Sequence, residues 1–136
     1  MTTIALSTDI HIALIILIAL TSLAHMLVLR FENPYKVRRY TRYMLPLFHM
    51  FVASNAFTGF IIMAMLHLPI YGPRYILMIV VTIALIGLHI AINKALKWAN
   101  PKDDKIFARF KKRVTKIVTY ELFILLSSTL VLFYII

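Results

Sequence analysis

Four long apolar stretches, separated by short polar segments, constrain this chain more than any other feature. They cover about residues 10–29, 44–68, 74–95 and 117–136. A helix of about 20 residues crosses the hydrocarbon core of a bilayer, and in lipid a helix satisfies its own backbone hydrogen bonds. The sequence therefore predicts an all-α protein, an integral membrane up-down four-helix bundle that forms one domain over residues 1–136.

The composition agrees with a membrane protein. Hydrophobic residues make up 62% of the chain and the mean hydropathy is +0.88, whereas a soluble domain is only about half apolar. No basic residue precedes the first apolar stretch, and no small-residue cleavage site follows it. We therefore expect this stretch to remain in the mature protein rather than to be removed as a signal peptide.

The formal net charge of +10 is concentrated in two segments between the apolar stretches. Nearly all the basic residues fall within residues 30–42 and 94–116, and Arg74 is the exception. This distribution is typical of cytoplasmic loops, so we predict that both basic loops face the cytoplasm of an inner or plasma membrane. Both termini would then lie on the opposite side. The expected partners are anionic lipid headgroups, not nucleic acid.

Other residue types exclude several kinds of site. The chain has no cysteine, which rules out disulfides, thiolate metal ligands and cysteine-bound iron–sulfur clusters. It has only three glycines and no Gly-rich phosphate loop, and no spacing of Ser, His and Asp indicates an activated nucleophile. The sequence thus identifies no catalytic residue and leaves open whether the protein is an enzyme.

Ionisable residues inside the apolar stretches are the candidates for function, because such side chains are costly in a membrane. In each stretch, one ionisable residue lies about 5–7 residues from the basic residue that borders the stretch, which is about 7–11 Å along a helix axis. We therefore predict that four side chains point into the bundle at a similar depth in its cytoplasmic half, namely His25, His49, His89 and Glu121.

Two kinds of ligand suit three imidazoles and a carboxylate. Heme b is the first hypothesis, with axial ligands from His25, His49 and His89 and with Glu121 as a hydrogen-bond or proton partner. His11 lies about four helical turns before His25 on nearly the same helix face, and it is a further heme candidate. The alternative is a zinc, copper or iron ion bound by His25, His49, His89 and Glu121 in a metal-binding or metal-transporting bundle.

A third interpretation needs no cofactor. The chain would then be a non-catalytic accessory subunit of a larger membrane complex, or a homo-oligomer, whose histidines only form hydrogen bonds. For His11 and His67, which lie near the surface opposite the basic loops, hydrogen bonding at the membrane interface is the simpler interpretation.

The layout of helices and ionisable residues resembles that of the HemJ-type protoporphyrinogen oxidases and the related CopD-like membrane proteins. The resemblance covers most of the chain as topology and spacing. It implies a four-helix membrane fold with a heme- or copper-linked role, in which His11 matches the first-helix heme ligand. His89 and Glu121 match a third-helix histidine and a fourth-helix glutamate. Met78 stands where the family has a lysine, and Tyr120 and Phe123 stand where it has asparagine and proline.

Overall fold

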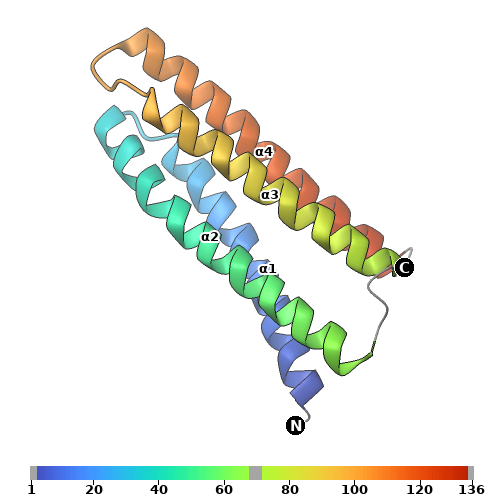
Figure 1. Ribbon diagram of the computed structural model, residues 1–136. Coiled ribbons are helices and arrows are strands. Elements are labelled where there is room, and N and C mark those ends of the chain that lie inside the picture. The colour runs from blue at the N-terminus through green and yellow to red at the C-terminus, as the bar shows by residue number, and fades with distance from the viewer. Residues whose placement is uncertain (1–2, 68–71, 135–136) are drawn as a thin grey trace.

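The computed structural model describes residues 3–67 and 72–134, which form four helices (Figure 1). All four helices are long and apolar enough to cross a membrane. The all-helical fold with four such helices is therefore confirmed. The helices are α1 (Thr3–Val28), α2 (Pro34–Met65), α3 (Pro73–Lys97) and α4 (Asp104–Tyr134).

The helices run alternately up and down, and each packs mainly on its neighbour in the chain. α1 pairs with α2 and α3 pairs with α4, and smaller interfaces join α1 to α4 and α2 to α3. The connections α1–α2 and α3–α4 lie at one end, whereas α1 begins and α4 ends at the other, which we call the far end (Figure 1). Leu68, Ile135, Ile136 and most of the turn between α2 and α3 lie outside the described residues.

Helices α2 and α4 extend into the segments predicted as basic loops, which corrects the expectation of two basic loops. The sequence predicts a loop over residues 30–42, but α2 begins at Pro34. α4 likewise begins well before residue 117. Proline at the first helical position has a backbone angle that suits a helix, and the fully buried Val37 packs in one apolar cluster with Phe107 and Phe110 of α4. Most basic residues therefore project from helical extensions at one end, which we call the basic end.

A side-chain cap fixes the start of α2. Asn33 Oδ1 accepts hydrogen bonds from the backbone N–H groups of Tyr35 and Lys36, at 2.9 and 3.4 Å. We expect Asn33→Ala to lower the free energy of unfolding by ~1 kcal/mol, measured by denaturant unfolding in detergent. Asn93→Ala, an exposed position inside α3, should be neutral or slightly stabilising because alanine favours a helix interior. Equal effects of the two changes would show that the cap contributes nothing.

Two buried apolar clusters hold the bundle together. One lies toward the basic end and includes residues of α2, α3 and α4 together with Leu29, which directly follows α1. The other lies nearer the middle and is formed by Ile18, Phe48, Val52, Leu85 and Leu125. At the basic end, Lys111 Nζ also donates a hydrogen bond to the Phe31 carbonyl at 2.6 Å, which ties α4 to the α1–α2 connection.

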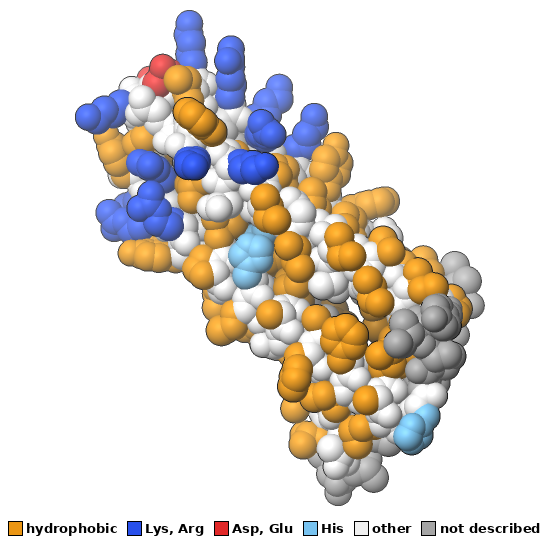
Figure 2. Space-filling view, in the orientation of Figure 1, with side chains coloured by type: hydrophobic (Ala, Val, Ile, Leu, Met, Phe, Trp, Pro, Cys, Tyr) orange, Lys and Arg blue, Asp and Glu red, His pale blue; other side chains and the backbone are white. Residues whose placement is uncertain are grey.

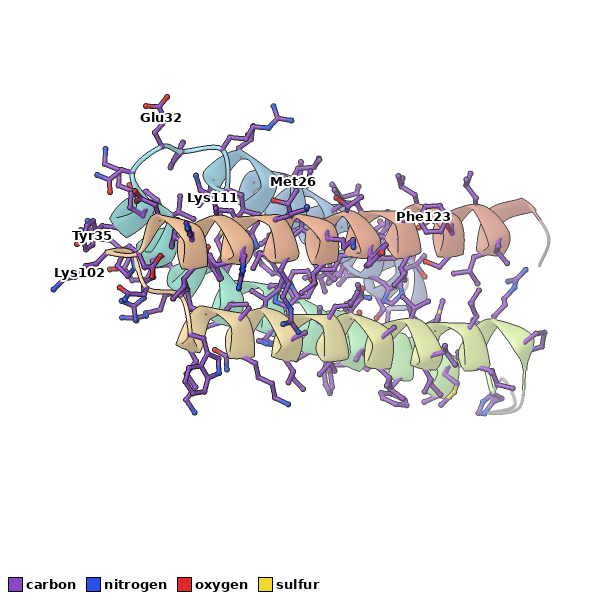
Figure 3. The ribbon with its side chains drawn as sticks, turned by 90° about the horizontal axis from the view of Figure 1, so that it is seen from above. Met26, Glu32, Tyr35, Lys102, Lys111 and Phe123 are labelled. Atoms are coloured by element: carbon purple, nitrogen blue, oxygen red, sulfur yellow. The ribbon has the colours of Figure 1, made fainter. Side chains whose placement is uncertain are left out.

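The exterior is divided by side-chain type. Lys and Arg gather at the basic end, and apolar side chains cover most of the remaining face in Figure 2. Figure 3 shows Glu32 and Lys102 at the basic end and Phe123 on the outside of α4, where 68% of its surface is exposed. A broad apolar exterior with a charged end is the pattern that a lipid bilayer favours.

Candidate functional site

Buried polar side chains from all four helices form two contact groups inside the bundle, Ser22–Glu121–His89 and His25–Thr41, and together we call them the polar cluster. Polar groups in an apolar interior cost free energy unless they find partners. Their contacts therefore indicate what the cluster can do.

The central contact joins α3 to α4. His89 Nε2 lies 2.8 Å from Glu121 Oε1, and the two side chains are only 2% and 0% exposed. Glu121 Oε2 accepts a hydrogen bond from Ser22 Oγ at 3.3 Å. The His89–Glu121 contact has ion-pair distance without hydrogen-bond geometry, so both nitrogens of His89 and Oε1 of Glu121 lack a hydrogen-bond partner within residues 3–67 and 72–134. Ser22 therefore holds the Glu121 carboxyl group in place, and Oε1 of that group can still accept a further hydrogen bond.

Aromatic rings of α2 pack around His89. The Phe48 ring stacks on the imidazole at a centroid distance of 3.5 Å and an interplanar angle of 5°. The half-buried His49 ring meets the His89 ring edge-on, 5.3 Å away at 78°. One face of His89 is thus covered by protein, and no flat ligand lies against it without moving Phe48.

His25 is engaged elsewhere in the polar cluster. Its Nε2 lies 3.1 Å from Thr41 Oγ1. Of the side chains predicted to converge, the structure brings together His49, His89 and Glu121 directly. Among the residues that the structure describes, no three His, Asp or Glu side chains are arranged to hold a metal ion. The axial heme roles of His25, His49 and His89, and the metal site, stay predictions.

A cavity of about 190 Å³ lies nearer the far end, between all four helices, and we call it the outer cavity. Its walls are mostly apolar, which is typical of sites that bind small molecules. His11 on α1 and Met78 on α3 both line it, and Asn55, Ala56 and Gly59 form part of the α2 wall. His67 belongs to neither site: it is exposed after the end of α2, with a φ of 51°.

Hydrogen bonds determine which nitrogen of His11 carries the hydrogen in the neutral ring. Nδ1 lies 3.1 Å from the Asn55 carbonyl oxygen and 2.9 Å from Thr58 Oγ1. Thr58 donates its own hydroxyl hydrogen to the same carbonyl at 2.9 Å, so both neighbours of Nδ1 act as acceptors. In the neutral ring Nδ1 must therefore carry the hydrogen, and Nε2 keeps a free lone pair. Metal-binding histidines in proteins are oriented in this way by a backbone carbonyl.

The cavity walls offer few other polar groups. Thr82 donates its hydroxyl to the Met78 carbonyl, and Ser128 and Thr129 donate theirs to the Leu125 carbonyl. These hydroxyl hydrogens are therefore used within their own helices. Asn55 Oδ1 is buried and has no hydrogen-bond partner within the described residues. The outer cavity thus combines mostly apolar walls with one imidazole, that of His11, whose Nε2 takes no part in these hydrogen bonds.

An apolar layer separates the outer cavity from the polar cluster. Ile18, Val52, Leu85 and Leu125 line the cavity and are each no more than 7% exposed. Three of them stand four residues, or about one helical turn, from Ser22, His89 and Glu121. The two sites are therefore stacked along the bundle with about 5 Å of apolar side chains between them.

The residues that orient the candidate ligands have no distinctive signal in the sequence. Ser22 and Thr41 are small hydroxyl residues, which are common in apolar helices. Asn55, Thr58 and Gly59 lie three and four residues apart, so they share one face of the second apolar stretch. This spacing indicates a shared helix face, but it does not reveal that the face contacts His11. That contact is known only from the structure.

Comparison with known proteins gives no match: no family model, no curated protein and no solved structure is similar to the chain.

Proposed function

We propose that the chain is an integral membrane protein that binds heme b in the outer cavity, where His11 would bind the iron. The hydrogen-bonded orientation of His11 carries the proposal, because it leaves Nε2 as a free electron-pair donor beside an apolar cavity. The likeness to the HemJ-type proteins assigns the same role to a first-helix histidine. It is a likeness of topology and spacing only.

The residues around the cavity are of the kind that hold a flat apolar cofactor, and the cavity of about 190 Å³ must widen to admit one. Alanine and glycine on α2 leave room for close approach, and aliphatic side chains from α1, α3 and α4 would exclude water. Met78 also lines the cavity, and a methionine thioether can bind heme iron. His11 would bind the iron, Asn55 and Thr58 would orient its ring, and Met78 would be a second candidate ligand.

Bound heme b supplies reversible one-electron redox chemistry. The chain itself would position the cofactor and set the polarity around it. The polar cluster lies one apolar layer away, and the His89–Glu121 pair there is a candidate to hold a proton near the cofactor. We infer that the basic end faces the cytoplasm, because Lys and Arg are enriched on that side of membrane proteins.

Absorption spectroscopy tests the heme proposal. Detergent-purified protein would be reconstituted with heme b and separated from free heme. We expect a Soret band in a fixed heme-to-protein ratio, with sharpened alpha and beta bands after reduction. Failure of the purified, folded protein to retain heme would overturn the proposal. Stoichiometric metal in elemental analysis without a Soret band would favour the metal-binding alternative instead.

Two glycines provide a matched test of the cavity. A Cβ at Gly59 would lie 3.3 Å from His11 Cε1, whereas a Cβ at Gly87 would meet nothing within 4 Å. Overpacking costs about 1–3 kcal/mol, so we expect Gly59→Val to weaken heme binding by about 5- to 150-fold. Gly87→Val makes the same change inside a helix without touching His11. The affinity of this variant for heme, measured by titration, should equal that of the unmodified protein. Equal affinities of the two variants would show that heme binds away from His11.

A further inference from the structure

A second cavity lies at the basic end, where α3 ends and α4 begins, and we call it the basic pocket. It has a volume of about 330 Å³. Three cationic side chains line it, two of them on α4, and its apolar walls include one indole ring and one phenyl ring. The lining residues are Lys94, Ala95, Trp98, Ile106, Arg109, Phe110 and Arg113.

Helical spacing explains why these side chains converge. Lys94 and Trp98 are four residues apart on α3, and Arg109 and Arg113 are four residues apart on α4. Phe110 is only 5% exposed and belongs to the apolar cluster at the basic end, so it anchors the floor of the pocket. None of the residues that line the pocket is acidic. The pocket therefore presents concentrated positive charge over an apolar floor.

The first turn of α4 does not compete for an anion. Asp103 Oδ1 already accepts hydrogen bonds from the backbone N–H groups of Lys105 and Ile106, at 3.0 and 3.2 Å. An anion in the basic pocket would thus be bound by side chains. Guanidinium and ammonium groups are suited to phosphate, and arginine can contact it with two parallel hydrogen bonds.

The surroundings favour a phosphate that carries acyl chains. Along α3, Ile86 and Ile90 precede Lys94 at intervals of four residues, and they are 37% and 48% exposed. Trp98, 79% exposed, stands just after the apolar helix ends, where tryptophan commonly lies at a membrane interface. A lipid could therefore place its headgroup in the pocket and an acyl chain along the exposed isoleucines.

We propose that the basic pocket binds the phosphate headgroup of an anionic phospholipid. A headgroup without an ammonium group suits the site because a second cation would be repelled by Lys94, Arg109 and Arg113. The site is at the opposite end from the outer cavity, and its occupancy does not depend on heme.

Trp98 provides the experiment, because it is the only tryptophan in the chain. Bromine on an acyl chain quenches indole fluorescence on contact. Detergent-solubilised protein would be titrated with brominated phosphatidylglycerol, brominated phosphatidylcholine or inorganic phosphate. We expect saturable quenching by phosphatidylglycerol and at least tenfold weaker binding of phosphatidylcholine. Equal quenching by the two lipids would overturn the headgroup proposal, and displacement of bound lipid by inorganic phosphate at similar concentration would assign the site to free phosphate.

A pair of double variants separates a specific site from general charge. Arg109→Gln with Arg113→Gln removes two pocket cations and should weaken phosphatidylglycerol binding by about 30-fold, at ~1 kcal/mol per cation. Arg39→Gln with Arg42→Gln removes the same charge from α2, outside the pocket, and should weaken binding less than threefold. Equal losses in the two double variants would show diffuse attraction to the basic end and would overturn the site.

Discussion

Replacing His11 with alanine is expected to abolish stable heme binding. Nε2 of this residue is the proposed iron ligand, and its loss leaves an apolar cavity with no imidazole. The Soret band of the reconstituted variant should fall to the level of free heme. Added imidazole should restore the band, because a small imidazole can occupy the space that the side chain has left.

Controls distinguish ligation from folding. Thr58→Val keeps His11 but removes the hydroxyl that contacts Nδ1 at 2.9 Å. Hydrogen-bond partners of metal-binding histidines are worth about 10- to 100-fold in metal affinity, so we expect this variant to bind heme more weakly by about that factor. His67→Ala should bind heme normally, because His67 does not line the cavity. The assignment would be reversed if His11→Ala kept its heme and His49→Ala lost it. That result would move the cofactor to the inner set of histidines.

Replacing Glu121 with leucine is expected to lower the free energy of unfolding by about 1–3 kcal/mol. The change removes one member of a buried polar pair, which leaves His89 without its carboxyl neighbour and Ser22 without its acceptor. Reversible unfolding in mixed detergent and denaturant measures the effect. Glu32→Leu at the exposed basic end should change the stability by less than about 0.5 kcal/mol.

A double variant shows whether the effect belongs to the pair. When both members of a buried polar pair are replaced by apolar residues of similar shape, the change can be nearly neutral. His89→Leu with Glu121→Leu should therefore be more stable than Glu121→Leu alone. Simple addition of the two single effects would contradict a direct interaction across the 2.8 Å contact.

The helices were predictable because they depend on local properties of the chain. Runs of apolar residues, interrupted near Pro34, Gly72 and Pro101, indicated four helices of membrane-spanning length. The bounds of α2 and α4 were less predictable. The basic segments are helical because Val37, Phe107 and Phe110 bury one another at that end, and this contact joins residues about 70 positions apart.

The candidate sites, like the helices, were predictable from the sequence only in part. The sequence alone determined which ionisable residues fall within apolar stretches, and counting along each helix placed His89 and Glu121 at a similar depth. Only the tertiary structure decided the contacts: Phe48 covers His89, Thr41 engages His25, and the α2 carbonyl of Asn55 orients His11. Helical periodicity gives a residue's height and face along its own helix. The rotation and separation of one helix against another depend on how their side chains pack, so the cavity and its free imidazole nitrogen could be found only in three dimensions.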